Sequence, residues 1–160
     1  MKEWFKYEFG YVNIDSENLY LTNSGNWSET KDLTEKTKSV ARKNDSRSSS
    51  VLGFIILIVG LLGFAIIKSI IDGKLGITLI LFAIGGGYKF YEYMKSEIGA
   101  QFKIPFNKIS EIKFNENNIE LFFINGEGNT DSYKLYKTED KAINIINILN
   151  AHLVSLRLNI

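Results

Sequence analysis

The side chains of this chain that could carry out chemistry are few. Two pairs of carboxylates lie close together in sequence, Asp15 with Glu17 and Glu116 with Glu120, and such pairs can serve acid–base catalysis or bind calcium. Each pair flanks a turn rich in asparagine, where acidic side chains commonly cap the backbone instead. The single histidine is His152, and there is no cysteine. We therefore predict a protein that is not an enzyme, with no catalytic residue, no metal site and no cofactor.

The overall charge argues against one class of partner. The chain has 19 Lys and Arg against 18 Asp and Glu, which leaves a net charge of +1 on 160 residues. Such a balance creates no field that attracts nucleic acid, and no basic stripe is interleaved with aromatic residues. We predict no nucleic-acid partner.

Two long apolar segments lie between the polar parts of the chain. They span residues 51–71 and 75–94 and are separated by Asp72-Gly73-Lys74. Each is about 20 residues long, which at about 1.5 Å per residue matches a hydrocarbon core of about 30 Å. The remainder of a 160-residue chain is too small to enclose two such helices. The sequence therefore predicts a transmembrane helical hairpin over residues 51–94, with the lipid bilayer as a partner.

Positive charge is concentrated on the two outer flanks of this hairpin. The basic residues there are Lys31, Lys36, Lys38, Arg42, Lys43, Arg47, Lys89, Lys95 and Lys103. The connecting turn has only Lys74. By the positive-inside rule we predict a multi-pass protein of the cell inner (cytoplasmic) membrane, with both termini cytoplasmic.

Five of these basic residues form a predicted membrane-surface contact: Lys36, Lys38, Arg42, Lys43 and Arg47. They lie in residues 31–50, a basic and then serine-rich juxtamembrane segment for which helix, tether and disorder all remain open. Each would gain about 1 kcal/mol beside anionic lipid. The alternative is that these residues only set the topology.

Small residues recur along the two apolar segments. The positions singled out for helix packing are Gly53, Gly60, Gly76, Ala83 and Gly87. Small side chains let helix backbones approach closely, either within one chain or between copies in a homo-oligomer. The one polar side chain at mid-membrane depth is Thr78, which favours an anchor over an ion pathway.

The first polar flank, residues 1–30, has the pattern of strands. Residues 5–11 alternate aromatic side chains with polar residues or glycine, which predicts one strand. Residues 19–21 predict a second strand after a turn, and Trp27 begins a short third.

The second polar flank, residues 100–154, predicts about four strands followed by a helix. The strand patterns cover about residues 101–106, 109–114, 119–124 and 133–135. Apolar residues at helical spacing between Ala142 and Leu153 predict an amphipathic helix that Thr138 caps. Neither flank alone could cover its own sheet, so we expect the two to join on one side of the membrane.

The order of these elements resembles the pleckstrin-homology-like (PH-like) fold, a bent seven-stranded barrel with a C-terminal helix. It looks in particular like small bacterial membrane proteins whose PH-like domain is split by a transmembrane hairpin. The likeness rests on Phe9-Gly10-Tyr11-Val12, Leu19-Tyr20-Leu21, the stretch Ile104–Ile109, the stretch Ile119–Phe123 and the helix Ala142–Leu153. The resemblance implies an α+β membrane protein with a split barrel.

The same resemblance bears on ligands. Many PH domains bind phosphoinositide headgroups through basic residues in the first hairpin loop. Here the loop Asn13–Asn18 is acidic, so this chain departs from the pattern at that place. We predict a non-enzymatic, membrane-anchored binding or scaffolding module that presents its cytoplasmic domain to a protein partner. The alternative is a small oligomeric membrane effector, such as a toxin or defence component, that perturbs the bilayer through its glycine-rich hairpin.

Overall fold

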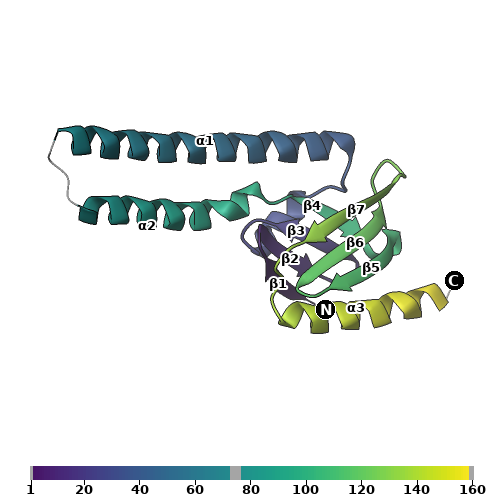
Figure 1. Ribbon diagram of the computed structural model, residues 1–160. Helices are drawn as coiled ribbons and strands as arrows, with labels where there is room; N and C mark the ends of the chain where they lie inside the picture. Colours follow the sequence, from purple (N-terminus) through teal and green to yellow (C-terminus); the bar gives the residue numbers. More distant parts are fainter. Residues whose placement is uncertain (1, 73–76, 159–160) are drawn as a thin grey trace.

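The alternating patterns of the first flank form a four-stranded antiparallel sheet. The computed structural model describes residues 2–72 and 77–158, with only the backbone of residues 77–83 and 152–158 (Figure 1). The strands, in their order across the sheet, are β1 (Glu3–Tyr7), β2 (Gly10–Ile14), β3 (Asn18–Thr22) and β4 (Phe102–Pro105). The fourth strand follows the apolar segments, and Leu19 of β3 pairs with Ile104 of β4. The two flanks therefore do join in one sheet.

A second, three-stranded antiparallel sheet forms from the later flank alone. Its strands, again in order, are β5 (Ile109–Asn115), β6 (Asn118–Ile124) and β7 (Thr130–Leu135). Every second residue of β6 is buried, including Ile119, Leu121 and Phe123. This is the period expected of a strand with one face on the core.

The predicted single strand over residues 5–11 is wrong, because the chain reverses in its middle. Glu8 and Phe9 form a tight turn between β1 and β2. Gly10 follows with φ of +154°, and a Cβ there would lie 2.4 Å from the carbonyl oxygen of Thr22. Only glycine fits this backbone and this close approach. The strand expected at Trp27 is also wrong, since residues Trp27–Asp32 form the 3₁₀ helix η1.

The predicted split barrel of about seven strands is wrong as well. Between β4 and β5 the chain turns through the short 3₁₀ helix η3 (Phe106–Lys108), and no ladder joins these two strands. On the other side two backbone hydrogen bonds link the end of β1 to the chain after β7: the Glu8 N–H donates to the carbonyl of Tyr136 at 2.8 Å, and the Glu139 N–H donates to the carbonyl of Lys6 at 3.1 Å. The described strands thus make two separate sheets, and no barrel closes.

The inner faces of the two sheets pack on each other and on a C-terminal helix. Phe102 of β4 lies 5.9 Å from Phe123 of β6 between ring centroids, so aromatic rings span the gap between the sheets. Helix α3 (Lys141–Leu158) buries Ala142, Ile146 and Leu149 against this core. We call the two sheets and α3 the β-domain.

Thr138 does not cap α3. Its hydroxyl donates instead to the carbonyl of Asn117 at 3.0 Å, in the turn between β5 and β6. The helix begins three residues later, at Lys141. The predicted cap is therefore wrong, although the helix itself forms.

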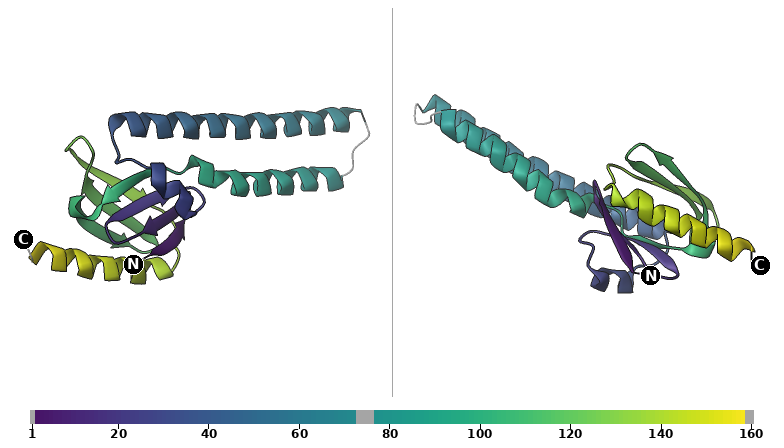
Figure 2. Two further views of the ribbon diagram at one scale, coloured as in Figure 1. Left: turned by 180° about the vertical axis from the view of Figure 1, so that it is seen from behind. Right: turned by 90° about the horizontal axis from the view of Figure 1, so that it is seen from below.

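Two long helices project together from the β-domain (Figures 1 and 2). Helix α1 (Lys38–Ile71) and helix α2 (Ile77–Met94) lie side by side, and the short 3₁₀ helix η2 (Lys95–Ile98) returns the chain to β4. Thr37 is the N-cap of α1, since its hydroxyl oxygen accepts the backbone N–H of Val40 at 3.3 Å. The juxtamembrane segment is thus helical from residue 38. We call α1 and α2 the arm.

The segment before α1 joins the two sheets, and we call Thr34–Lys38 the strap. On one side the carbonyl of Thr34 accepts the N–H of Lys103 in β4 at 2.9 Å. On the other side the carbonyl of Lys36 accepts the N–H of Gly126, in the turn between β6 and β7, at 2.8 Å. The strap thereby fixes the start of α1 to both sheets.

Candidate functional site

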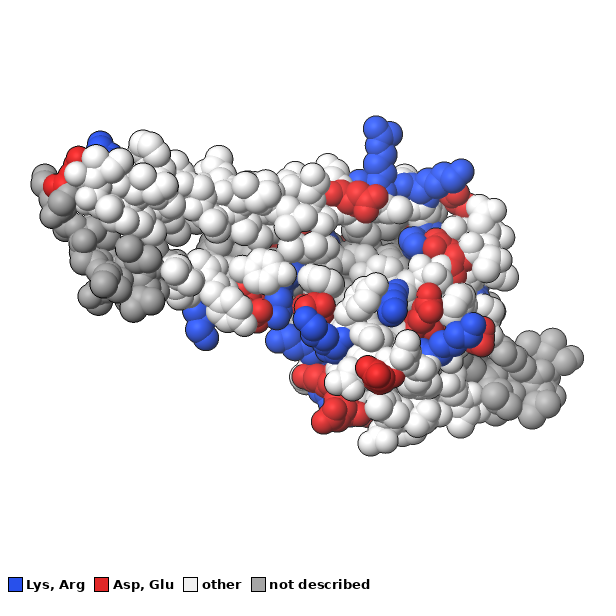
Figure 3. Space-filling model, in the orientation of Figure 1, with Lys and Arg blue, Asp and Glu red and all other residues white. Residues whose placement is uncertain are grey.

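Helix α1 is long and apolar enough to cross a membrane. It has no charged residue between Arg47 and Lys68, and in Figure 3 charges gather on the β-domain and at the ends of the arm. Only 6% of its most apolar 18-residue window is buried. A core helix of a soluble protein would be mostly buried, whereas Ile56 is 70% exposed and Phe64 is 67% exposed.

The predicted second span, residues 75–94, is contradicted. Among the described residues α1 alone meets the length and composition of a membrane span. The physical reason is that the apolar run of α2 is short. The helix begins at Ile77 and reaches the charged residue Lys89 after about 18 Å. This length is well under the hydrocarbon thickness of about 30 Å. The predictions of a transmembrane hairpin and of a multi-pass topology are therefore wrong.

Of the five predicted lipid-contacting residues, Lys36 is bound to the β-domain. Its ammonium group lies 2.8 Å from a carboxylate oxygen of Asp131 in β7 and 3.4 Å from the carbonyl of Ser132. It also lies 5.8 Å from the ring centroids of both Phe102 and Phe123. Burial would raise the pKa of Asp131, but the contact with Lys36 outweighs it and holds that pKa below its ordinary value. Lys36 thus completes the strap.

Arg47 is also directed to the β-domain. Its guanidinium donates to the carbonyl oxygen of Gly99, just after η2. Three residues earlier on α1, the side-chain amide of Asn44 donates to the carbonyl of Gln101 at 3.3 Å. These contacts hold the second turn and third turn of α1 against the segment that leads into β4.

Lys38, Arg42 and Lys43 are exposed on the first turns of α1. They lie in the N-terminal turns of α1, before its apolar part. A bilayer surface would meet α1 in this region. The contact of the basic set with anionic lipid stays a prediction, and the structure leaves these three side chains accessible for it.

Several of the small residues predicted to pack helices have open space around them. A Cβ built at Gly53, Gly60 or Gly87 meets no heavy atom within 4 Å. Gly76 and the side chain of Ala83 lie outside the described residues. Close helix packing at these positions stays a prediction.

Asp15, one of the carboxylates considered for catalysis, stabilises a turn. Asp15 accepts the backbone N–H groups of Glu17 and Asn18, both at 2.8 Å, and the hydroxyl of Tyr20 at 2.8 Å. Burial would raise the pKa of Asp15, but these three hydrogen bonds lower it below its ordinary value. Burial, together with the bond to Asp15, raises the pKa of Tyr20 to about 12.

The other candidates for chemistry are dispersed. Glu116 adopts φ of +53° in the turn between β5 and β6, and Glu120 lies on the outer face of β6. The side chain of His152 is outside the described residues. Within the described part of the chain, no three acidic or histidine side chains converge as a metal site.

Two polar features of the structure have no signal in the sequence. Lys36 and Asp131 are separated by 95 residues, so spacing could not pair them. In the hairpin of β2 and β3, the Thr22 hydroxyl donates to the Asn13 side-chain oxygen at 2.8 Å, and the Asn13 amide donates to the carbonyl of Gly25 at 2.9 Å. Asn13 and Thr22 are fully buried, so their pairing satisfies groups that would otherwise be costly to bury.

Comparisons with protein-family models, with curated proteins and with solved structures find no match. The resemblance to PH-like membrane proteins therefore stays a prediction, and the functional argument rests on the geometry of α1 and of the β-domain.

Proposed function

We propose that this protein is a membrane-anchored, non-enzymatic binding module. In this proposal the apolar part of α1 inserts into a lipid bilayer, and the β-domain binds a protein partner at the membrane surface. The observation that carries it is the exposure of α1, whose most apolar window is 6% buried.

The energetic cost of leaving α1 in water supports insertion. Nine large apolar side chains of α1 are at least half exposed: Phe54, Ile56, Leu57, Val59, Leu61, Phe64, Ile67, Ile70 and Ile71. Transfer of one such side chain out of water contributes about 1–2 kcal/mol at this degree of exposure, so the set contributes on the order of 10 kcal/mol. An apolar surface of this extent calls for lipid or protein around it.

The edge of the β-domain best suited to a partner is β5. The other edges are in contact with other parts of the chain: the carbonyl of Lys6 in β1 accepts the Glu139 N–H at 3.1 Å, the strap lies along β4, and at β7 the Lys36 ammonium group donates to the Ser132 carbonyl at 3.4 Å. Within the described residues, backbone groups 111–115 of β5 have no backbone partner outside β6. An unpaired edge of this kind can accept an extended peptide as an additional strand.

A small pocket beside this edge could receive a side chain of such a peptide. It has a volume of about 240 Å³ and lies between β5, β6 and β7. Phe114, which is 39% exposed, forms part of its wall, and Lys113 and Lys134 flank Glu120 across the strands. Backbone pairing would provide affinity, and this pocket would select the side chain.

Flotation with lipid vesicles tests the anchor. We expect the full-length chain to float with phosphatidylcholine vesicles in a density gradient. Replacing both Ile56 and Phe64 by arginine should reduce flotation strongly, because each arginine near a helix centre costs about 2.5–3.5 kcal/mol in insertion. Phe114→Arg, on the β-domain, is the matched control and should float normally. A wild-type chain that stays at the bottom of the gradient would refute the anchor.

Photo-crosslinking in cells tests the partner. A photoreactive amino acid at Lys113, on β5, should give one discrete adduct with another protein. The same amino acid at Lys31, an exposed residue of η1, serves as the control and should give none. Equal adducts at both positions, or none at Lys113, would count against β5 as the docking edge.

One observation favours the second function, an oligomeric effector that perturbs the bilayer. Gly53 and Gly60 lie seven residues apart on α1, and no heavy atom lies within 4 Å of a Cβ built at either. A helix of a second copy could approach closely along this face. Dye leakage from vesicles on addition of the chain would support this function, and intact vesicles would exclude it.

A further inference from the structure

The open edge of the β-domain carries two opposite charges that are two residues apart. Glu111 and Lys113 lie on the outer face of β5, and Ile112 between them packs against the core. Both charged side chains are 56% exposed, and 3.4 Å separates their charged groups. An ion pair with this exposure contributes little to stability, so both groups remain able to pair across a new interface.

The hairpin of β5 and β6 determines which backbone groups face the open edge. Asn115 pairs with Asn118 across the two-residue turn Glu116-Asn117, so this pair is hydrogen-bonded within the hairpin. Hydrogen-bonded and non-hydrogen-bonded pairs alternate along an antiparallel ladder. The N–H and C=O groups of Ile112 and Phe114 therefore point away from β6, toward the open edge.

We infer that β5 pairs with β5 of a second copy of this chain, antiparallel and about a two-fold axis at Ile112. The inference rests on the proposed function, which takes β5 as the docking edge, and it identifies the partner. In this arrangement Ile112 faces Ile112 of the second copy, and the two exchange backbone hydrogen bonds. Glu111 then faces Lys113 of the second copy, and Lys113 faces its Glu111.

The charges select this register. A lysine on an edge strand normally discourages pairing with another strand. A pair centred on Glu111 would place two carboxylates opposite each other, and a pair centred on Lys113 would place two ammonium groups opposite each other. Of these three registers, the one centred on Ile112 alone places opposite charges face to face, and it does so twice. These facing positions are non-hydrogen-bonded pairs, in which the side chains are closest.

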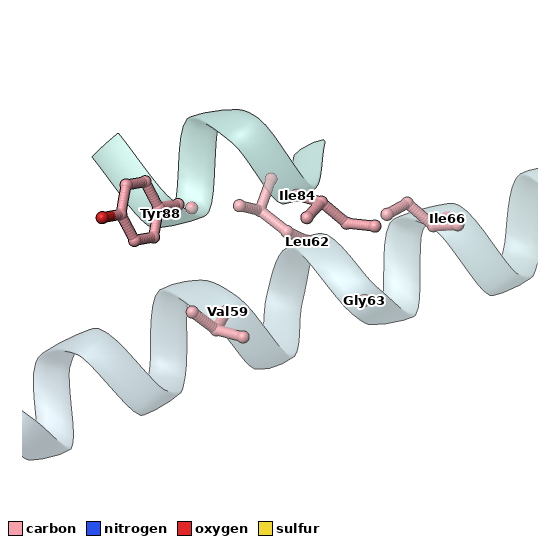
Figure 4. A pocket seen from close by; sticks show the side chains of 7 residues that line it. Val59, Leu62, Gly63, Ile66, Ile84 and Tyr88 are labelled. Atoms are coloured by element: carbon pink, nitrogen blue, oxygen red, sulfur yellow. The ribbon is translucent and has the colours of Figure 1, made fainter. Parts of the chain in front are cut away.

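The pairing leaves the arm outside the interface. In the second sheet it is β7 that is joined to the strap, through Asp131 and Lys36, so β5 is the edge away from the strap (Figure 1). The apolar hollow of about 340 Å³ between the two helices of the arm, where Leu62 and Ile84 lie, is also outside the interface (Figure 4). The two copies therefore need no contact between their arms.

Disulfide trapping of the full-length chain in detergent micelles tests the pairing. The chain has no cysteine, so Ile112→Cys introduces a single thiol at the residue that would face its own copy. The Cα atoms of a hydrogen-bonded pair are about 5.5 Å apart, a distance that a disulfide spans. With mild oxidation we expect at least about fivefold more covalent dimer from Ile112→Cys than from Lys31→Cys, the exposed control on η1.

Charge substitutions on the Ile112→Cys chain separate this pairing from random collision. Glu111→Lys places ammonium groups opposite each other, and Lys113→Glu places carboxylates opposite each other. Each should lower the covalent dimer by about fivefold or more. An equal mixture of the two variants should restore the dimer, because every facing pair then has opposite charges. The double substitution should restore it for the same reason. Tryptophan fluorescence reports whether each variant is folded.

The outcomes distinguish this inference from the proposed function. Equal dimer from Ile112→Cys and Lys31→Cys, or a mixture that gives no more dimer than its components, would overturn the pairing of two copies. The photo-crosslinked adduct at Lys113 should have twice the chain mass of 18.2 kDa. An adduct with a different protein would overturn the pairing and leave β5 as the docking edge. Absence of both the covalent dimer and any adduct at Lys113 would overturn both proposals for β5.

Discussion

The strap makes a specific prediction about Lys36. Replacing Lys36 by methionine keeps most of the aliphatic volume but removes the ammonium group. That group makes the 2.8 Å ion pair with Asp131, the 3.4 Å hydrogen bond to the Ser132 carbonyl and contacts of 5.8 Å with the rings of Phe102 and Phe123. The strap would then be joined to the second sheet mainly through its backbone.

The magnitude follows from the burial of the pair. The side chains of Lys36 and Asp131 are 19% and 26% exposed, so water screens the pair only in part. A hydrogen bond to a charged group contributes about 1.5–3 kcal/mol when it is partly buried. After the substitution Asp131 still accepts the N–H of Ser132 at 2.8 Å, which limits the loss. We expect Lys36→Met to lower the free energy of unfolding by about 2 kcal/mol.

The assay is urea unfolding of the full-length chain in detergent micelles, followed by tryptophan fluorescence. The two tryptophans are Trp4, in β1 of the β-domain, and Trp27, in η1 between β3 and the strap, so the signal comes from outside the arm. Lys38→Met is the matched control, because Lys38 is exposed and close in sequence. We expect the control to change the free energy of unfolding by less than about 0.5 kcal/mol.

A double-mutant cycle with Asp131→Asn isolates the pair. If the ion pair acts as the structure indicates, the coupling energy should be on the order of 1–2 kcal/mol. A coupling below about 0.3 kcal/mol would refute the reasoning. A Lys36→Met variant that keeps full stability but binds anionic vesicles less well would instead support the lipid contact predicted from the sequence.

Further predictions concern backbone space and pH. Gly99→Ala should lower the free energy of unfolding of the β-domain by about 1–3 kcal/mol, because a Cβ there would lie 1.9 Å from the carbonyl oxygen of Phe9. Gly53→Ala, with open space around it, should not destabilise the β-domain in the same urea experiment. Because the pKa values of Asp15 and Asp131 are lowered in the folded chain, their contribution is present above the unfolded value of about 3.9 and is lost as pH falls through the folded values. Urea midpoints should therefore be flat from about pH 7 to pH 5 and should fall below about pH 4; a midpoint that rises on acidification would contradict the assigned directions.

Strands whose pattern is local could be predicted from the sequence. Ile119, Leu121 and Phe123 alternate with half-buried residues because β6 has one face on the core, and the sequence shows that period directly. The turn at Glu8-Phe9 could not be predicted from the sequence, because the alternation of aromatic residues continues through it without a break. What decides that turn is a long-range fact, the close approach of Gly10 to Thr22.

The closure of the fold could not be predicted from local patterns. Seven strand regions and a helix are compatible with a closed barrel, but closure depends on whether the outer strands pair across the gaps. The 3₁₀ helix η3 separates β4 from β5, and on the opposite side the chain around β1 is linked to the segment after β7 by the backbone hydrogen bonds of Glu8 with Tyr136 and of Lys6 with Glu139. Neither the 3₁₀ turn nor these few long-range hydrogen bonds have a signature in residue periodicity.

In the candidate site, too, the features that follow from composition could be predicted, and those that depend on tertiary contacts could not. The apolar character of α1 is a property of composition and was predictable. The role of Lys36 was not, because its partner Asp131 is 95 residues away. In α2 the length of the apolar run before Lys89 matters more than the overall composition of residues 75–94.

The accessibility of a spin label on α1 tests the central claim most directly. The chain has no cysteine, so Ile56→Cys and Ser49→Cys each offer one labelling site in the full-length protein. In vesicles, the claim that α1 is embedded in lipid predicts that a nitroxide at position 56 collides readily with oxygen and rarely with a water-soluble nickel chelate. The label at position 49, near the charged end of α1, should show the opposite preference. Ready collision of the nickel chelate at position 56 would place α1 in water and contradict the account.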